Sequence, residues 1–581
     1  MKRILQVLLA ASLAFSCAGE RIDGPSFTPL EYIADAPSYD PATEYLNPVI
    51  PGFWPDPSVC RVGDDYYMVN STFQYFPGIP VWHSTDLVDW ELCGYVLDTD
   101  DKVQYWNELM QFGIFAPQIS YNPHDGKYYV VCTQINGPLG CFFCTTDDPA
   151  GGSWSDPVLL PKVPGIDPSL FFDDDGKAYI VSAASPADVG GKANYFDDNA
   201  IILWHFDYVK GETFGEPKII MQSGVHPELQ PQALEGPHLY KIGGKYFLLC
   251  AEGGTDLGHS IVLFSSDSPE GGFSPCGINP ILTQRDLPVD RESPVSCVGH
   301  GDIVSTPDGH WYVVFLGTRP YVGVDTFNTG RETFMLPVSW QDGQMVILPP
   351  GEAIKGVASK DEGLLALSAS NRIKGFDGYA PGPLWGRNGL SSFAATVRGS
   401  LEGRMSFSAD GNLHLECSGV SLDSLDRPSM VLERITGHTF KAETVMRFAP
   451  APSQEAGLIC WHDDDHYMKL TKTLDSSGKP VLRLEERGAE ARTALRSLLY
   501  GRMDGRTLYS YDLPLEGAEA SSPLLLKVEA TDPSTYVFSY APVRPGRKAE
   551  PRRIGSPLDA RHLSTLNCGG FQGAMVGVYA Y

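Results

Sequence analysis

The sequence predicts an all-β protein, built as a five-bladed β-propeller followed by a β-sandwich. Three observations lead to this fold class. With 60 Gly and 46 Pro among its 581 residues, the chain has many turns and few long helices. A short motif recurs at intervals of roughly 50 to 70 residues. Beyond residue 349 the motif stops, although strand-like alternation of apolar and polar residues continues to the end of the chain.

The repeat joins a small or acidic residue, usually followed by proline, to an apolar strand, a tight polar turn and an aromatic-rich strand. Gly-containing turns between alternating apolar runs indicate hairpins. Units of this length suit propeller blades of four short strands. A tandem array of sandwiches is the competing architecture, but it explains less well why each unit opens alike. The five openings are Asp56–Val59, Ala116–Ile119, Asp167–Leu170, Glu235–Leu239 and His300–Val304.

The first repeat opens on an acid held between two prolines, because Asp56 lies between Pro55 and Pro57. Proline lacks an amide N–H and biases the residue before it toward extended backbone. We therefore expect Asp56 to project from a stiff, non-helical segment at the mouth of a strand.

The remaining boundaries follow from changes in composition and pattern. A chain of this length is too long for one ordinary core, so two or more domains are expected. The predicted segments are a signal peptide over residues 1–16, a tether over 17–46, the propeller over 47–349, a linker over 350–374 and the sandwich over 375–581.

The N-terminus predicts export. Lys2 and Arg3 precede the apolar run Ile4–Phe15, which is too short to span a bilayer. The small residues before Cys17 resemble a loose bacterial lipobox, which would make Cys17 the lipidated first residue of a mature lipoprotein. A plain secretory peptide with an incidental cysteine is the alternative. This predicts the bacterial cell envelope, with membrane contact only through a lipid anchor on Cys17.

Charge and cysteine usage exclude several classes of function. A net charge of −27 argues against binding a nucleic-acid backbone, whereas a neutral sugar is compatible with it. The one CxxC motif, Cys141–Cys144, lacks a second CxxC or a His at zinc-like spacing. We therefore expect buried free thiols with at most one or two disulfides.

Equivalent positions in the repeat should face one axial cavity, because each blade of a propeller begins with its innermost strand. Three repeats carry an acid there: Asp56, Asp167 and Glu235. Convergent carboxylates suit acid–base hydrolysis, and burial with mutual repulsion would raise the pKa of at least one of them. Turn capping and blade-to-blade hydrogen bonding are the structural alternatives.

Aromatic residues gather near the same openings. Sugar rings present apolar faces that pack on aromatic side chains. Each ring taken alone is more often part of a core. The candidates are Phe53, Trp54, Phe73, Tyr75, Phe76 and Phe115.

These residues lie in recognisable stretches of sequence. NPVIPGFWPDPSVCRVGDDYYMVNSTFQYFPGIPVWHSTDLVDW, FAPQISYNPHDGKYYVV, GIDPSLFFDDDGKAYIV, ALEGPHLYK, GHGDIVSTPDGHWYVVFLGTR and TGRETFMLPVSWQDG occur in this order. Together they resemble glycoside hydrolase family 43, in its β-xylosidase and α-L-arabinofuranosidase branch. RPSMVLERITGHTF and QEAGLICW resemble the concanavalin-A-like sandwich attached to that branch.

The resemblance implies an inverting, exo-acting hydrolase that releases xylose, arabinose or both from oligosaccharides of xylan or arabinoxylan, with no cofactor required for the chemistry. By position, Asp56 matches the general base, Glu235 the general acid, and Asp167 the carboxylate that tunes the acid. An arabinan-directed hydrolase of the same fold and a non-catalytic glycan-binding surface lipoprotein remain the alternatives.

Further roles come from the same resemblance. Phe73 matches an aromatic wall of the sugar site, Arg331 a ligand of sugar hydroxyls, and Phe571 an aromatic that the sandwich inserts. His300 matches a histidine near the channel axis where some members bind a divalent cation, commonly calcium; a structural hydrogen bond is the alternative. Phe115 stands where the family commonly has Trp, and a smaller ring could shift sugar selection. Trp54 and Phe115 are also predicted to contact substrate.

Overall fold

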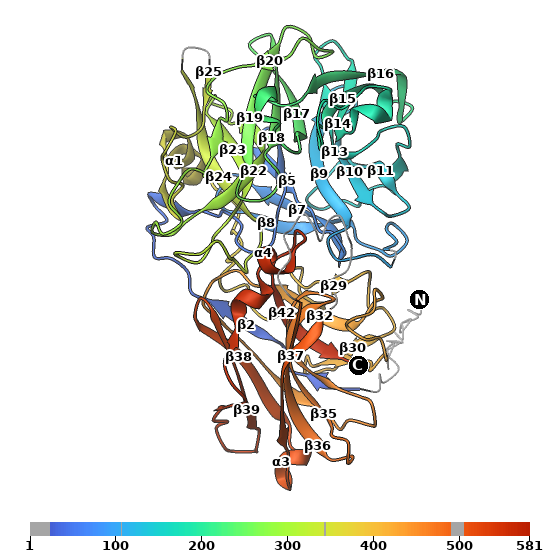
Figure 1. Cartoon of the computed structure of the whole chain (residues 1–581), viewed down its shortest axis with the longest axis vertical. Coiled ribbons are helices and arrows are strands. Elements are labelled where there is room, and N and C mark those ends of the chain that lie inside the picture. Colours follow the sequence, from blue (N-terminus) through green and yellow to red (C-terminus); the bar gives the residue numbers. More distant parts are fainter. Residues whose placement is uncertain (1–23, 106, 342–343, 490–504) are drawn as a thin grey trace, which may run out of the picture.

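The computed structural model describes residues 24–105, 107–341, 344–489 and 505–581. These residues form two bodies joined end to end, one drawn in blue to yellow and the other mainly in orange to red (Figure 1). The predicted signal peptide and Cys17 lie outside the described residues. Within the described residues, no helix combines the length and apolar character needed to cross a membrane.

The first body is a five-bladed propeller, as predicted. Each blade is an antiparallel sheet formed by one continuous stretch of chain, and the first strands of neighbouring blades contact one another around the axis. The first blade contains β4 (Ser58–Val62), β5 (Asp65–Val69), β7 (Gly78–Ser84) and β8 (Glu91–Leu97), and the second contains β9 (Gly113–Asn122), β10 (Lys127–Ile135), β11 (Gly140–Thr146) and β12 (Val158–Leu159). The third contains β13 (Ile166–Phe172), β14 (Ala178–Ala184), β15 (Ala200–Asp207) and β16 (Glu212–Gln222), and the fourth contains β17 (Glu235–Ile242), β18 (Lys245–Glu252), β19 (Ser260–Ser266), β20 (Ser274–Pro275) and β21 (Leu282–Thr283). The fifth contains β22 (Ser296–Ser305), β23 (Trp311–Thr318), β24 (Glu332–Gln341) and β25 (Gln344–Val346).

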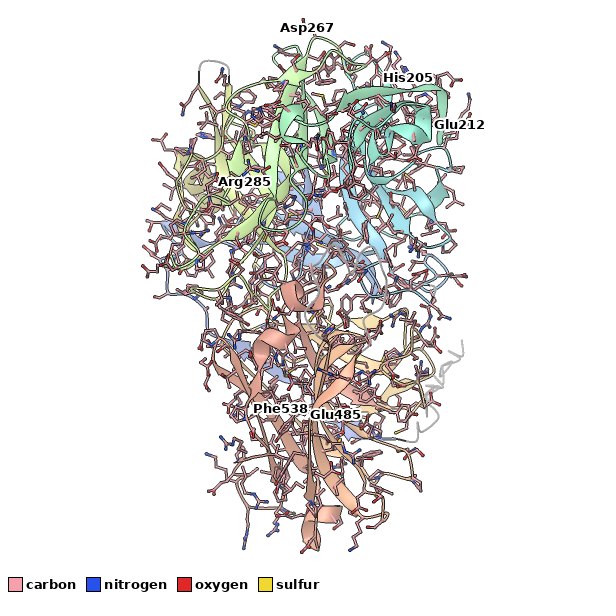
Figure 2. All side chains as sticks on the ribbon, in the orientation of Figure 1. His205, Glu212, Asp267, Arg285, Glu485 and Phe538 are labelled. Carbon is pink, nitrogen blue, oxygen red and sulfur yellow. The ribbon has the colours of Figure 1, made fainter. Side chains whose placement is uncertain are left out.

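Burial explains why these segments form strands. The second strand of each blade is packed between neighbouring blades, so both of its faces are apolar. In β10, which reads KYYVVCTQI, the residues Tyr128 to Gln134 are all buried. Aromatic and β-branched side chains suit such a pleated, enclosed surface. Outer strands meet water, as at His205 and Glu212 on the rim of the third blade (Figure 2).

Each innermost strand is kinked where the repeat motif begins. The left-handed residues are Asp56, Ala116, Asp167, Gly236 and His300, with φ of 53°, 34°, 52°, 57° and 48°. The strand register shifts at this point in the second to fifth blades, which marks a bulge. Four of the five residues precede a proline, whose missing N–H suits a broken ladder. The expectation of extended backbone at Asp56 is therefore wrong, because packing of the bulge overrides the local proline bias.

A ring of polar side chains joins the blades two residues after each bulge. These groups are buried on the channel axis and bond to the strand of the next blade. The ring supplies blade-to-blade bonds that the separate sheets do not provide. The bonds are Ile119 N–H to Ser58 Oγ (3.1 Å), Leu170 N–H to Gln118 Oε1 (3.0 Å) and Ser169 Oγ–H to Pro237 O (2.5 Å).

Asp302 closes this ring between the last blade and the first. Its carboxylate accepts hydrogen bonds from the Ser58 hydroxyl (2.7 Å), the Val59 amide (2.9 Å) and the Tyr240 hydroxyl (2.5 Å). His238 Nδ1 lies 3.7 Å from the same carboxylate. Three blades therefore share one buried acid, so Asp302 is a main polar fastener of the closed propeller.

The predicted tether over residues 17–46 is wrong from residue 24 onward. β1 (Ser26–Phe27) and β2 (Glu31–Ala34) pair with β33 (Phe440–Arg447) and belong to a sheet of the sandwich. In β2 exposed and buried residues alternate, so Tyr32 faces the core. The apolar pattern here is too short to be recognised among the Pro, Asp and Ser residues around it.

The predicted linker over residues 350–374 is also structured and belongs to the propeller surface. β26 (Val357–Ser359) pairs with β3 (Glu44–Leu46), and α1 (Glu362–Ala369) buries Leu364 in the propeller core. Asp361 accepts hydrogen bonds from the Leu364 amide (2.9 Å), which caps the helix, and from the Tyr312 hydroxyl (2.6 Å). The segment is therefore fixed to the blades rather than free.

The second body is the predicted sandwich of two antiparallel sheets. Residues from both sheets form one core, in which Phe538 is fully buried (Figure 2). The nine-stranded sheet contains β30 (Met405–Phe407), β31 (Leu413–Leu415), β1, β33, β38 (Leu524–Asp532), β39 (Thr535–Pro542), β40 (Arg552–Arg553), β2 and β41 (Leu558–Asp559). The six-stranded sheet contains β32 (Ser429–Arg434), β42 (Met575–Ala580), β34 (Ala456–Asp463), β35 (His466–Leu474), β36 (Pro480–Gly488) and β37 (Arg506–Pro514).

The two bodies are joined by buried charges and a shared apolar cluster. Arg434 of the sandwich donates to the Phe53 carbonyl (2.8 Å) and stacks 3.4 Å from the centroid of the Trp54 ring. Arg319 and Glu332 of the propeller form a bidentate pair at 2.6 and 2.7 Å, and Arg319 also donates to a sandwich carbonyl. Small pairs of strands complete this region: β6 (Tyr75–Phe76) with β29 (Thr396–Val397), and β27 (Trp385–Gly386) with β28 (Gly389–Leu390).

The described cysteines form no disulfide with one another, and most of them are buried. Cys141 and Cys144 both lie on β11, where each side chain is packed in the propeller core. This agrees with the expectation of buried thiols and gives no disulfide within the described ranges.

Replacing Asp302 by Ala should lower the free energy of unfolding by about 3 kcal/mol or more, because three buried donors lose their acceptor. Thermal and urea unfolding followed by tryptophan fluorescence would measure the loss. The matched control is Asp64→Ala, in an exposed turn of the first blade, which should stay within about 0.5 kcal/mol of the parent. Equal stability of the two variants would contradict a fastening role for Asp302.

Candidate active site

The axial channel contains a cavity of about 400 Å³ where the propeller meets the sandwich. It is lined by the three predicted acids together with Arg331 and His300. The predicted aromatics Phe73, Phe115 and Phe571 also line it. The strand openings therefore converge as expected, and a loop of the second domain completes the wall.

The three acids do not occupy equivalent positions, which corrects the alignment of the repeats. Asp56 and Asp167 are the left-handed residues of their bulges, whereas the left-handed residue of the fourth blade is Gly236. Glu235 precedes it by one position and pairs across the sheet with Ala251. The bulge presents both of these successive positions to the cavity, so Glu235 reaches it from a different point of the backbone.

Asp56 is held as a buried, charged carboxylate. Its Oδ2 accepts a hydrogen bond from the Ser71 hydroxyl at 2.6 Å, and its Oδ1 accepts one from Arg331 at 3.3 Å. His300 Nδ1 lies 3.8 Å from Oδ1. Burial alone would raise the pKa of Asp56, but Arg331, His300 and Ser71 outweigh it and hold the pKa below its usual value. Asp56 is therefore ionised throughout the neutral range.

Glu235 has the opposite electrostatic environment. Burial, together with the negative charges of Asp167 and Asp56, raises its pKa well above the usual 4.5. Asp167 Oδ2 accepts the amide N–H of Gly236 at 2.9 Å, which fixes Asp167 beside the acid. Burial also raises the pKa of Asp167, against the influence of His300. The cavity thus holds one carboxylate kept charged and one carboxyl kept protonated.

One wall of the cavity is aromatic and is shared between the domains. Phe571, from the sandwich, stacks on Phe73 at 5.9 Å between centroids and meets Phe115 edge-on at 5.8 Å. The Arg331 guanidinium lies 5.2 Å from the Phe571 ring and 5.8 Å from Phe73. An apolar wall with a fixed cation beside it suits a sugar, which has apolar faces and hydroxyl edges.

The prediction that Trp54 contacts substrate is wrong. Its ring is 1% exposed and packs edge-on against Trp82 at 5.0 Å, while Arg434 covers one face. It does not line the cavity. Proximity in sequence to Asp56 misled the assignment, because the side chains of Trp54 and Asp56 enter different environments.

Two histidines lie on the channel axis. His300 occupies the left-handed position of the fifth blade, and a Cβ on Gly236 would lie 3.1 Å from its ring. A side chain at Gly236 would therefore crowd the His300 ring, in addition to the backbone strain that a φ of 57° gives any residue but glycine. His259 is buried, and its Nδ1 donates to the Cys297 carbonyl (3.1 Å). Burial lowers the pKa of His259 to about 3.

The residues around His300 offer few of the ligands that a calcium ion needs. Calcium takes about six to eight oxygen ligands. His300 offers an imidazole, and the nearby oxygens of Asp56 already accept bonds from Ser71 and Arg331. A calcium ion bound at His300 would therefore take most of its ligands from water.

Sequence reasoning missed four residues that line the cavity. Ala116 and Ile166 are ordinary apolar residues of the repeat, distinguished only by their place at the bulges. Thr255 and His259 follow β18, and no role was assigned to either from the sequence. Aligning the repeats on the left-handed residue would have indicated Ala116 and Ile166, while the other two depend on loop packing.

Comparisons with known proteins agree with this geometry. A family model described as glycosyl hydrolases family 43 matches residues 45–345, more than half of the chain. The chain belongs to glycosyl hydrolase family 43. A second model, the β-xylosidase C-terminal concanavalin-A-like domain, matches residues 395–581. Both parts of the sequence-based assignment are thereby confirmed.

Individual relatives of this family 43 protein span nearly its whole length. It is 32% identical to a xylosidase/arabinosidase of Butyrivibrio fibrisolvens, over 92% of this chain and 95% of the relative. It is 33% identical to a non-reducing-end α-L-arabinofuranosidase of Bacteroides ovatus, over 92% and 91%. The crystal structure of a family 43 protein retrieved from a capybara gut metagenome matches with a TM-score of 0.83 and 33% sequence identity. The match covers 97% of this chain and 100% of that protein. The protein is thus a glycoside hydrolase of an inverting family.

Arg331→Gln should move the acidic limb of the kcat/KM profile to higher pH by roughly 1–2 units, because loss of the cation raises the pKa of Asp56. Steady-state rates on an aryl glycoside across the pH range would show the shift. Arg372→Gln, at an exposed ion pair on the propeller, should leave the limb in place. An unmoved acidic limb in Arg331→Gln would show that this guanidinium does not keep Asp56 ionised.

Proposed function

We propose that the protein is an exo-acting hydrolase that removes xylose or arabinofuranose from the non-reducing ends of xylan and arabinoxylan oligosaccharides. The observation that carries the proposal is the opposite pKa displacement of Asp56 and Glu235 in one cavity. Pairs of acids whose environments separate their pKa values are a mark of acid–base catalysis. The names of the relatives supply the sugar class.

Asp56 acts as the general base in this proposal. Its carboxylate takes a proton from a water molecule, whose oxygen attacks the anomeric carbon from the face opposite the leaving group. The Ser71 hydroxyl and Arg331 fix the orientation of the carboxylate. A base on rigid backbone holds that water in line at little entropic cost.

Glu235 acts as the general acid. It gives its proton to the glycosidic oxygen as that bond breaks, so the leaving sugar departs as an alcohol. The negative charge of Asp167 keeps Glu235 protonated beforehand. Inversion follows from the two roles, because attack and departure take place on opposite faces of the ring, with the acids roughly 6.5–9.5 Å apart.

The lining of the cavity supports exo action. Strand openings of the propeller and Phe571 of the sandwich surround it together. Phe571 and Phe73 wall one side. Such a site accepts a terminal sugar, whereas an internal sugar needs room for chain on both sides.

A product assay on arabinoxylan oligosaccharides tests the proposal, with the anomeric configuration of the first product followed by NMR. Parallel rates on aryl β-xyloside and aryl α-arabinofuranoside rank the two sugars, and arabinan oligosaccharides test the arabinan-directed alternative. We expect release of single pentoses with inverted configuration. Release of internal fragments or retention of configuration would overturn the proposal.

Glu235→Gln should hydrolyse xylobiose at least about a hundredfold more slowly than the parent, because the leaving oxygen loses its proton donor. A dinitrophenyl glycoside, which needs no acid assistance, should lose far less, and the alkaline limb of its pH profile should disappear. Glu252→Gln is the control, since Glu252 is a buried acid of the same blade outside the cavity lining. Equal loss on both substrates would refute the role of Glu235.

We also propose that the protein is a lipoprotein of the bacterial cell envelope, anchored at Cys17. Because β1 begins at Ser26, such an anchor would hold the sandwich close to the membrane. Labelled palmitate should enter the parent and the Cys93→Ala control when expressed in a bacterium, but not Cys17→Ala. Absence of label in the parent would favour a plain secretory peptide.

A further inference from the structure

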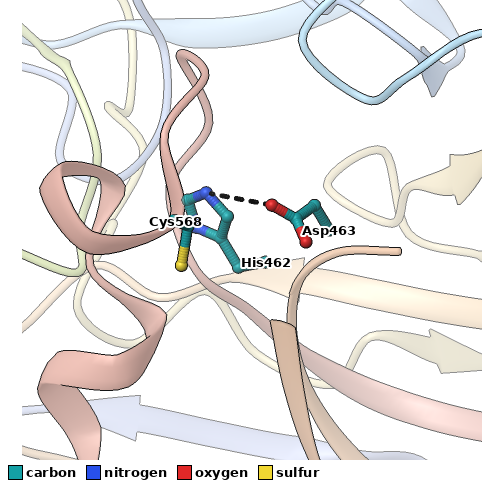
Figure 3. Close-up of side chains that lie close together, drawn as sticks. All are labelled: His462, Asp463 and Cys568. Carbon is teal, nitrogen blue, oxygen red and sulfur yellow. Dashed lines mark ion pairs between the residues drawn. The ribbon is translucent and has the colours of Figure 1, made fainter. Parts of the chain in front are cut away.

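A group of metal-ligand side chains lies in the sandwich, outside the catalytic cavity. His462 and Asp463 end β34, and Cys568 ends α4 (Thr565–Cys568). Each offers one ligand atom, and these atoms lie within 4.8 Å of one another (Figure 3). Residues far apart in sequence thus bring nitrogen, oxygen and sulfur donors to one place.

The group is buried, and one of its polar atoms lacks a hydrogen-bond partner. His462 is 0% exposed and Cys568 is 3% exposed. The Nδ1 atom of His462 makes no hydrogen bond to any described residue. Polar atoms buried in this way are rare and costly unless something satisfies them. A cation between these side chains would do so.

We propose that His462, Asp463 and Cys568 bind a divalent transition-metal ion of the zinc class. Imidazole, carboxylate and thiolate are together the donors that zinc takes, whereas calcium and magnesium prefer oxygen alone. His466 supports the group by bonding through Nδ1 to Asp463 Oδ1 at 2.8 Å. Such hydrogen bonds from outside the ligand set orient metal ligands in known sites.

Metal binding at Cys568 has a simple proton balance. A metal–sulfur bond forms as the S–H bond of the thiol breaks, and the proton passes to solvent.

The site adjoins the chain segment that carries Phe571 into the active site. His462 Nε2 also faces the Gly569 carbonyl at 3.4 Å, and Phe571 follows two residues later. The helix α4 that carries Cys568 has only 4 residues and lies at the boundary of the two bodies (Figure 1). A metal here would therefore pin the turn that positions Phe571. This consequence rests on the proposed sugar site, whereas metal binding itself does not.

Metal binding is tested on the purified protein, stripped with a chelator and then dialysed against zinc or cobalt(II). We expect elemental analysis to find one zinc per chain, and the cobalt form to show a thiolate-to-metal charge-transfer band. Zinc should also raise the melting temperature of the stripped protein. If the parent, once stripped and then dialysed against zinc, holds no zinc, and if its cobalt form shows no such band, the site does not exist.

Cys568→Ser should abolish the charge-transfer band and weaken zinc binding at least about tenfold, because the soft ligand is lost. Cys460→Ser is the matched control, since Cys460 is a fully buried thiol of the same strand β34 outside the group. It should keep the band, and its loss there would overturn the assignment. Should Cys568→Ser not fold, His462→Gln gives the same test.

The link to Phe571 has its own readout. Removal of zinc should raise KM for an oligosaccharide several-fold, while leaving the pH limbs set by Asp56 and Glu235 in place. An unchanged KM would contradict the positioning role but not metal binding. Failure of the proposed function would instead appear as absent glycosidase activity with zinc bound.

Discussion

The left-handed residue in each innermost strand is the constraint on which the active site depends. A positive φ at a residue other than glycine costs about 1–3 kcal/mol, and four of the five blades carry such a residue there. In the second and third blades, both this residue and the one before it line the cavity. Proline after the bulge and the polar ring below it, closed by Asp302, hold the strained backbone in place. Catalytic side chains are thus fixed before any sugar arrives.

The same fold places two chemically similar acids in different surroundings. Asp56 has a cation and a hydroxyl beside it, whereas Glu235 has two carboxylates. Since both are buried, desolvation acts on each alike, and the neighbours decide the direction of the pKa. In the proposed mechanism, the difference between base and acid therefore arises from Arg331 and Asp167 rather than from the acids themselves. These two residues would then serve the chemistry although neither transfers the proton.

Much of the fold could be predicted because the repeat is local. Hairpin turns, apolar strands and the motif at the blade openings are all visible within short windows of sequence. The predictions that proved wrong concern contacts between residues that are distant in sequence. The shift of Glu235 relative to Asp167 arises because Gly236 takes the left-handed position in the fourth blade, whereas Asp167 itself takes it in the third. β2 needed its partner β33, and Trp54 is covered by Arg434, which lies far along the chain.

The sandwich contributes to the site in two physically separate ways. It supplies Phe571 to the cavity wall, and it fixes the opening segment of the first blade through Arg434, which bonds to Phe53 and covers Trp54. Asp56 follows Trp54 by two residues. The second domain therefore supports both the backbone of Asp56 and the aromatic wall of the sugar site. A boundary this dense in buried charge and aromatic contact resists sliding, because each shift would expose an unpaired guanidinium. The two bodies therefore act as one rigid catalytic unit.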